Sequence, residues 1–209
     1  SAAFNGFPAR SMMMIGVTGT DGKTTTSKLI YQILLAAGLK AGIISTVNAV
    51  IGDEIIDTGF HVTTPEAPEV QHYLRQMKES GVTHAVLEAT SHGLAQHRAT
   101  ACEFDIAVVT NITHEHLDYH GSYEGYRYAK AQLFRHLEAT VEKAGGNPRL
   151  AVLNKDDRSF DFLNELVKGR KVTYSLGQDT DIYAEDINYD PSVLHFTAVL
   201  PDGSRLPVD

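Results

Sequence analysis

Short apolar runs alternate along this chain with segments that have helical periodicity. The runs are rich in Ile and Val and are apolar at consecutive positions, which is typical of strands buried on both faces of a parallel sheet. We predict strands at residues 13–18, 41–47, 84–89, 106–110, 150–153 and 172–175. We predict helices at residues 29–37, 65–80 and 123–137. This alternation predicts a doubly wound α/β domain with a mostly parallel sheet, which binds ligands at the carboxyl ends of its strands.

Two segments depart from the alternation and resemble antiparallel β-hairpins. Residues 49–59 contain a Gly-Asp turn between apolar pairs, and residues 182–208 contain a Pro-Asp-Gly turn near the C-terminus. We find no internal repeat or flexible linker, so we treat residues 1–209 as one domain. Because the sequence begins at Ser1 and stops directly after a strand-turn-strand pattern, we expect it to be a truncated fragment of a longer chain.

Charge and composition exclude several classes of protein. A formal net charge of -8 argues against a nucleic-acid partner, because phosphate backbones are bound by an excess of Lys and Arg. The only cysteine is Cys102, so no intrachain disulfide can form, which is consistent with the reducing cytoplasm that we expect. No apolar stretch approaches the roughly 18 to 20 residues that cross a bilayer, so we expect no membrane insertion.

A glycine-rich segment between the first strand and the first helix is the strongest candidate for a phosphate-binding loop (P-loop). Its residues are Gly19, Thr20, Asp21, Gly22, Lys23, Thr24 and Thr25. Lys23 would contact the outer phosphates of ATP, and the Thr24 hydroxyl would bind Mg²⁺. The strict pattern fails at one position, where Val17 stands in place of its first glycine. The alternative interpretation is an ordinary glycine-rich turn.

Two further candidates are Glu88 and Lys130. Glu88 follows a predicted strand, where a carboxylate could bind the Mg²⁺ that accompanies ATP, although a helix-capping or surface role is the alternative. Lys130 shares a helical stripe with Tyr126, Leu133 and Phe134, which directs its amine toward the interior. Its alternative role is a lysine whose stem packs while its charge reaches solvent.

A histidine-rich segment follows the strand predicted at residues 106–110. His114, His116, Asp118 and His120 have the side chains of a transition-metal site. Tyr119 separates Asp118 from His120, however, and this breaks the register of the H-x-H-x-D-H signature of metallo-β-lactamase-type hydrolases. The spacing therefore disfavours zinc-dependent hydrolysis.

Taken in order, four elements resemble the central, ATP-binding domain of the Mur ligase family. They are the loop that starts at Gly19, the segment 88–98 with its Ser-His-Gly-Leu element, the segment 111–121 with its Asp-Tyr-His-Gly element, and Ala129-Lys130. The two four-residue elements indicate the MurE type within this family. The resemblance covers roughly residues 14–175. The chain departs from the family at Asp21, where most members have Asn, and at Val62, where Asn often precedes two threonines.

The resemblance implies ATP-dependent amide bond formation in peptidoglycan synthesis. A UDP-N-acetylmuramoyl peptide precursor would be phosphorylated on its carboxylate, and an amino acid would then capture the acyl phosphate. By this resemblance Glu88 and His116 bind metal and Lys130 carries a carbamate, while Lys23 and Thr24 hold ATP with Mg²⁺. The residues that match precursor contacts are Thr63, Thr64, Thr90, Ser91, Gln96 and Arg98.

Two other functions compete with this interpretation. Folylpolyglutamate synthases share the loop, but that family lacks the Ser-His-Gly-Leu and Asp-Tyr-His-Gly pair. A nucleotide-binding fragment without chemistry of its own is the second alternative. We expect this fragment to bind Mg-ATP weakly and to form no peptide bond by itself.

Overall fold

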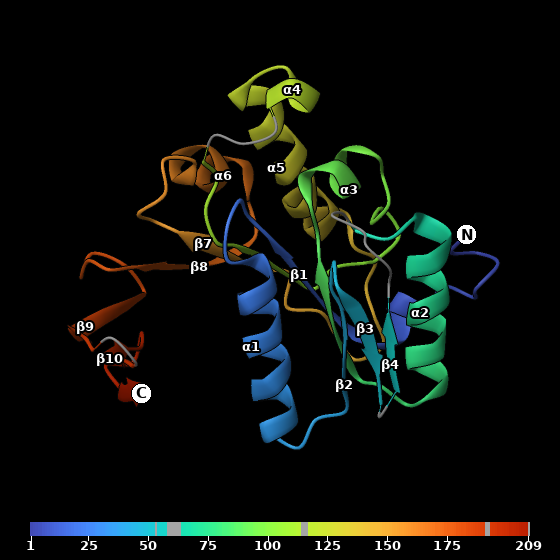
Figure 1. Cartoon of the computed structure of the whole chain (residues 1–209), viewed down its shortest axis with the longest axis horizontal. Helices are drawn as coiled ribbons and strands as arrows, with labels where there is room; N and C mark the ends of the chain where they lie inside the picture. The colour runs from blue at the N-terminus through green and yellow to red at the C-terminus, as the bar shows by residue number, and fades with distance from the viewer. Residues whose placement is uncertain (53, 58–63, 114–116, 191–192, 209) are drawn as a thin grey trace.

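The computed structural model describes residues 1–52, 54–57, 64–113, 117–190 and 193–208. In this part of the chain eleven strands form one sheet in the order β11-β10-β9-β8-β7-β6-β1-β5-β2-β3-β4 (Figure 1). The strands are β1 Met13–Thr18, β2 Ala41–Ile44, β3 Asn48–Ile51, β4 Glu54–Asp57, β5 His84–Glu88, β6 Ile106–Val109, β7 Leu150–Asn154, β8 Arg170–Ser175, β9 Ile182–Tyr189, β10 Leu194–Val199 and β11 Arg205–Val208. The helices are η1 Pro8–Ser11, α1 Lys23–Ala36, α2 Ala67–Glu79, α3 Ser91–Ala95, α4 Leu117–His120, α5 Tyr123–Ala139 and α6 Phe160–Leu166.

The sheet is mostly parallel, as the sequence predicts. Strands β2, β5, β1, β6, β7, β8 and β9 pair in parallel, whereas β3 and β4 extend one edge and β10 and β11 extend the other as antiparallel strands. From β1 the chain first adds β2 and β5 on one side of β1, and it later crosses over to add β6 on the other side. The carboxyl ends of β5, β1 and β6 therefore flank the point where the strand order reverses, which is where doubly wound folds bind ligands.

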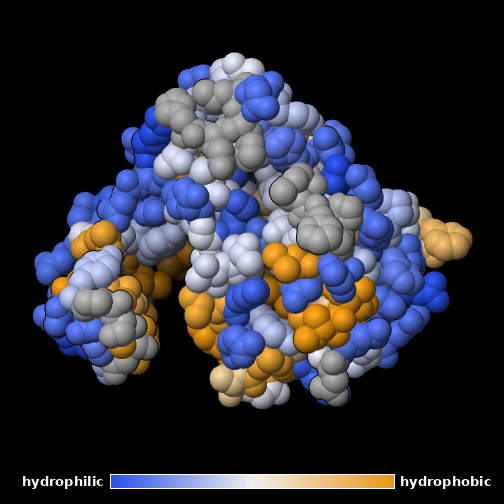
Figure 2. Space-filling model, viewed as in Figure 1, coloured by the Kyte–Doolittle hydropathy of each residue, from blue (hydrophilic) through white to orange (hydrophobic). Residues whose placement is uncertain are grey.

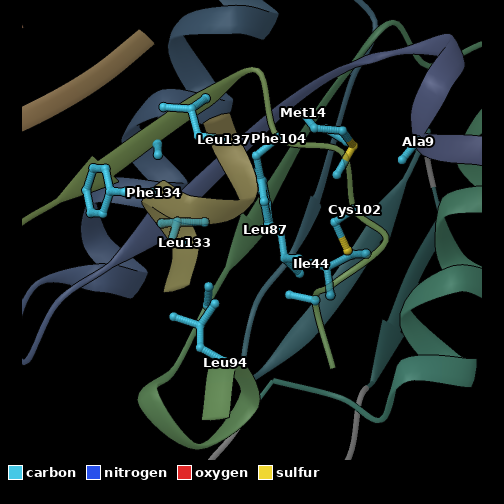
Figure 3. Packing of buried hydrophobic residues seen from close by; sticks show 14 of the residues in the cluster. Ala9, Met14, Ile44, Leu87, Leu94, Cys102, Phe104, Leu133, Phe134 and Leu137 are labelled. Atoms are coloured by element: carbon cyan, nitrogen blue, oxygen red, sulfur yellow. The ribbon is translucent and has the colours of Figure 1, made fainter. Parts of the chain in front are cut away.

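Helices cover both faces of the central strands, so successive residues of β1 are buried on opposite faces of the sheet. Ile15 joins the buried cluster beneath α1. Met14 joins the other cluster, beneath α2 and α5 (Figure 3). Gly16, which follows Ile15, permits close approach of α5 to the sheet, because a Cβ atom there would lie 2.6 Å from Leu133 Cδ1 and 2.8 Å from the Phe104 ring. A larger residue at this position would push α5 away from the sheet.

Apolar side chains also reach the surface on α1. Leu29 and Ile33 are 58% and 66% exposed, and apolar surface is visible around this helix in Figure 2. No helix in the described residues is both long enough and apolar enough to cross a membrane.

Several predicted element bounds shift in the structure. The strand expected at residues 41–47 ends at Ile44, because Ser45 donates its backbone N–H and its hydroxyl to the Asn48 carbonyl and the chain turns into β3. The helix expected at residues 65–80 begins at Ala67, where Glu66 and Glu69 form a capping box. Helices α3, α4 and α6 have four to seven residues and carry no periodicity that a sequence reading could detect.

A buried lysine ties together the amino ends of the central strands. Lys143 is 7% exposed and donates to the carbonyls of Met12 at 2.9 Å and Glu103 at 2.7 Å, and to Asp105 Oδ2 at 2.5 Å. The same carboxylate oxygen accepts from the Met14 N–H at 2.7 Å. Burial raises the pKa of Asp105 and lowers the pKa of Lys143, and the hydrogen bond between them opposes both shifts.

Candidate functional site

The segment between β1 and α1 curls tightly because two of its glycines adopt conformations that other residues rarely take. Gly19 has φ 154°, and a Cβ atom there would overlap Thr110 Oγ1. Gly22 has φ 78° and precedes the first residue of α1, Lys23. The Lys23 amine folds back to the Thr20 carbonyl at 2.7 Å. The backbone N–H groups at the start of α1 therefore lie beside a cation, in the arrangement that binds phosphate at helix N-termini.

The end of β6 holds this loop in place. The Thr20 N–H donates to the Asn111 carbonyl at 2.7 Å, and the Asp21 N–H donates to Asn111 Oδ1 at 3.0 Å. Thr110 Oγ1 donates to the Asp21 carbonyl at 2.6 Å, and the Thr113 N–H donates to Thr20 Oγ1 at 2.9 Å. These contacts were absent from our sequence prediction, because they depend on β6 lying next to β1.

A second set of hydrogen bonds supports the end of β6 from the neighbouring strands. Tyr174 on β8 donates its hydroxyl to the carbonyls of Val109 at 3.0 Å and Thr110 at 3.2 Å, and Asn154 on β7 donates to the Thr110 carbonyl at 2.7 Å. Burial raises the pKa of Tyr174 to about 12, so its hydroxyl remains a donor at neutral pH. The loop is thus anchored through three adjacent strands.

Glu88 closes one side of the loop. This side chain is 2% exposed, and its two carboxylate oxygens accept from Thr24 Oγ1 at 3.1 and 3.0 Å. Thr46, which follows β2, also directs its backbone N–H toward Glu88 Oε2 at 3.3 Å. Sequence reasoning missed Thr46, because the expected strand at residues 41–47 included it and because its contact with Glu88 depends on the pairing of β2 with β5. Hydroxyl and carboxylate oxygens are hard ligands, so this group fits Mg²⁺.

Lys130 lies on the other side of the loop. The side chain is 1% exposed, its amine donates to the Gly19 carbonyl, and its Nζ lies 4.5 Å from the centre of the Tyr126 ring. The Tyr126 hydroxyl is 3.1 Å from Thr20 Oγ1. The charge of Lys130 therefore does not reach solvent, and the alternative of a surface-directed lysine is wrong.

The residues matched to precursor contacts gather around α3. Thr64 and Thr90 are buried, and their hydroxyls are 3.2 Å apart, while the Thr90 hydroxyl also caps α3 by accepting from the Gly93 N–H. Ser91, the first residue of α3, is buried beside them. Two of these predicted contact residues, Thr90 and Ser91, therefore form the start of α3.

Gln96 and Arg98 lie at the exposed end of this group. Arg98 donates to the Thr64 carbonyl at 2.7 Å and to Gln96 Oε1, and it pairs with Glu66 at 2.8 Å. The Gln96 amide donates to the Tyr119 hydroxyl at 2.9 Å. The sequence alone assigned no contact to Tyr119, which connects α4 to the predicted precursor contacts.

Two predicted site residues, His116 and Thr63, lie outside the described residues, as do His114 and Val62. Among the residues that the structure describes, no three His, Cys, Asp or Glu side chains form a group that could hold a metal ion. The described side chains that could offer oxygen ligands to a metal are therefore Thr24, Thr46 and Glu88. Thr25 is exposed on the first turn of α1.

Comparison with known proteins places this arrangement in a recognised group. The family described as the Mur ligase middle domain matches residues 17–208. A UDP-N-acetylmuramyl-tripeptide synthetase of Roseiflexus sp. (strain RS-1) is 43% identical, and the match covers 98% of this chain and 41% of that protein. The chain spans about two fifths of the length of the curated relatives that it matches.

Solved structures show the same architecture. A UDP-N-acetylmuramoyl-L-alanyl-D-glutamate--2,6-diaminopimelate ligase superposes with a TM-score of 0.81 at 33% identity, covering 95% of this chain and 39% of that chain. The E. coli FolC structure superposes with a TM-score of 0.70 at 20% identity, covering 98% of this chain and 50% of that chain, which shows a likeness of fold alone.

Proposed function

Because this chain belongs to the Mur ligase family, we propose that it binds ATP with Mg²⁺ as the central domain of a cytoplasmic ligase of the MurE type. The ligase would add an amino acid to UDP-N-acetylmuramoyl dipeptide during peptidoglycan synthesis. The names of the relative that is 43% identical and of the structure that is 33% identical both describe this class of reaction. A folylpolyglutamate synthase function is less well supported, since FolC is 20% identical.

The observation that carries the proposal is the convergence of three groups on one loop. Lys23 contacts the Thr20 carbonyl, Lys130 contacts the Gly19 carbonyl, and Glu88 accepts from Thr24. All three lie at the carboxyl ends of β1 and β5 or on a helix packed against them, which is the expected ligand position in a doubly wound sheet. A structural turn would need neither a buried carboxylate nor a buried amine.

Each group has a defined part in phosphoryl transfer. The amides at the start of α1 and the Lys23 amine would hold the outer phosphates, and Thr24, Thr46 and Glu88 would hold the metal. Bound Mg²⁺ supplies charge neutralisation at the γ-phosphate. A precursor carboxylate oxygen then forms a bond to the γ-phosphorus, and the bond from that phosphorus to the bridging oxygen of ADP breaks. The amine of the amino acid attacks the acyl carbon, phosphate leaves, and the nitrogen loses a proton.

Lys130 is the candidate for carbamylation. A buried amine is more easily present in its neutral form than an exposed one, and only the neutral form attacks CO₂. After the ammonium group has lost one proton, the neutral amine nitrogen would bond to the carbon of CO₂ and lose a second proton, so that a cation is replaced by an anion with two hard oxygen ligands. Together with His116 and Glu88, this carbamate would bind the metal ion.

The precursor would approach over α3. Arg98, Gln96 and Tyr119 form a hydrogen-bonded chain at the exposed end of the α3 group, whereas Thr64, Thr90 and Ser91 lie beneath it. A guanidinium group that is already oriented by a backbone carbonyl suits the carboxylate or phosphate groups of such a precursor. Thr63 is proposed as a further contact.

Calorimetry with Mg-ADP and Mg-ATP tests the nucleotide site. We expect weak but measurable binding by the wild-type chain, and affinity lower by at least about tenfold in Lys23→Ala, since a hydrogen bond to a charged group is lost. A phosphate-release assay with precursor and amino acid should show no turnover by this chain alone. Unchanged affinity in Lys23→Ala would remove the loop from the proposal.

A further inference from the structure

The acidic residue of the loop, Asp21, has no part in the function proposed so far. It is exposed in the loop, two positions before Lys23. A carboxylate near bound phosphate weakens the binding of an anion unless a cation offsets it. The local hydrogen bonds and charges indicate what this carboxylate does.

The position of Asp21 is set by its backbone. Its N–H donates to Asn111 Oδ1 at 3.0 Å, and its carbonyl accepts from Thr110 Oγ1 at 2.6 Å and from Asn111 Nδ2 at 3.2 Å. With both backbone polar groups held by the end of β6, the residue cannot rotate out of the loop. Asp21 therefore stays in the loop, directly before Gly22 and the start of α1.

Among the described residues, the loop and its side-chain partners carry as many acids as lysines before any ligand binds. Two cations, Lys23 and Lys130, donate to loop carbonyls, and two acids, Glu88 and Asp21, lie at its metal side and its tip. In the described residues Asp21 forms no ion pair, because Lys23 turns its amine to the Thr20 carbonyl instead. With Asn at this position, the loop would lose one negative charge, and its net charge would be more favourable to a free nucleotide.

We propose that Asp21 makes the phosphate loop selective for nucleotide that carries Mg²⁺ over metal-free nucleotide. This inference rests on the proposed function. Mg²⁺ removes two negative charges from the bound polyphosphate, so the repulsion from Asp21 falls much more for the metal complex than for free ADP. Carbamylation of Lys130 would strengthen the selection, since it replaces one of the two cations with an anion.

The test is the ratio of two dissociation constants, measured by calorimetry for ADP in EDTA and for ADP in excess Mg²⁺. We expect Asp21→Asn, which keeps the shape of the side chain, to reduce the preference for Mg-ADP by about three- to tenfold. This reduced preference should come mostly from tighter binding of free ADP by the variant, and the difference from the wild type should shrink as ionic strength rises. Asp21→Glu keeps the charge and should keep the preference.

Asp202→Asn is the matched control, because Asp202 is an exposed acid in the turn between β10 and β11. It should leave both dissociation constants unchanged. If Asp21→Asn alters both constants by the same factor, Asp21 only shapes the loop and the inference is overturned. If the wild-type chain binds neither form of ADP, the proposed nucleotide site itself fails, and this inference falls with it.

Discussion

Two buried lysines lie at opposite ends of the same central strands, and they have different surroundings. At the amino end, Lys143 donates to two backbone carbonyls and to the Asp105 carboxylate. At the carboxyl end, Lys130 donates to the Gly19 carbonyl and lies against the Tyr126 ring. One lysine is paired with a buried acid and joins three segments, whereas the other is aimed at the loop that we assign to nucleotide.

The contrast teaches that burial of a charged side chain does not by itself identify a functional site. Lys143 is buried almost as deeply as Lys130, yet its partners are all parts of the framework. What distinguishes Lys130 is its position at the strand ends where a doubly wound sheet binds ligands. Variants at the two positions should therefore separate stability from binding.

The largest effect is expected at the amino end. Lys143→Met should lower the free energy of unfolding by about 3–5 kcal/mol at neutral pH, because it leaves the Asp105 carboxylate buried without its cation. Denaturant unfolding measures this loss. The double variant Lys143→Met with Asp105→Asn should recover part of it, since the uncompensated charge is gone. A loss below about 1 kcal/mol for the single variant would contradict the framework role.

That loss should depend on pH in a defined direction. Burial raises the pKa of Asp105, so the folded state holds this proton more tightly than the unfolded chain does. Its contribution to stability is therefore greatest below its ordinary pKa and falls as pH rises through the raised value. Lys143→Met removes a partner that lowers this pKa. The cost of the substitution should then decrease on acidification, by up to about 1.4 kcal/mol per pH unit.

Unfolding curves of Lys143→Met and the wild type, recorded in parallel from neutral to mildly acidic pH, measure this dependence. The double variant with Asp105→Asn should show a flatter difference from the wild type. A cost that grows as the pH falls would show that the sign assigned to Asp105 is wrong.

Lys130→Met should show the opposite pattern. We expect the free energy of unfolding to change by about 1 kcal/mol or less, since an apolar side chain of similar length replaces a buried charge. Affinity for Mg-ADP should nevertheless fall by about tenfold, as the candidate metal ligand is lost. Calorimetry and denaturant unfolding on the same sample measure both quantities. A large loss of stability with unchanged affinity for Mg-ADP would show that Lys130, like Lys143, has only a structural role.

The smallest effects are expected at the metal side of the loop. Thr46→Val should weaken the Mg²⁺ dependence of ADP binding by about two- to fivefold, since it removes one hydroxyl while the backbone N–H still donates to Glu88. Thr24→Val should weaken it more, because Thr24 contacts both oxygens of Glu88. Titration of Mg²⁺ into protein with ADP gives both values. The reverse order would mean that Thr24 is not a metal ligand.

Local patterns predicted the central strands well. The bounds of β1 match the expectation, and β5 and β6 each end one residue earlier than expected, because continuous apolar runs report burial on both faces. The same reasoning placed the loop and Glu88 at strand ends and directed Lys130 toward the interior, whereas the site roles of Glu88 and Lys130 came from the family resemblance and stay predictions. Each of these features depends on residues that are close in sequence.

Contacts across the sheet escaped prediction for a physical reason. Thr46, Thr110 and Asn111 reach the loop or Glu88 only because β2, β5, β1 and β6 lie in a particular order, which residue spacing does not specify. Tyr119 acquires its bond to Gln96 because α4 lies near α3 in space. Pairings of this kind are a property of topology.

The difference between the two buried lysines is tested most directly by carbon-13 NMR of the folded protein in labelled bicarbonate. Our account predicts a carbamate signal at neutral to mildly alkaline pH that disappears in Lys130→Met and on acid denaturation. The signal should persist in Lys143→Arg, which keeps a cation at the amino end. Absence of the signal in the wild type, or its survival in Lys130→Met, would contradict the assignment of Lys130 as the reactive lysine.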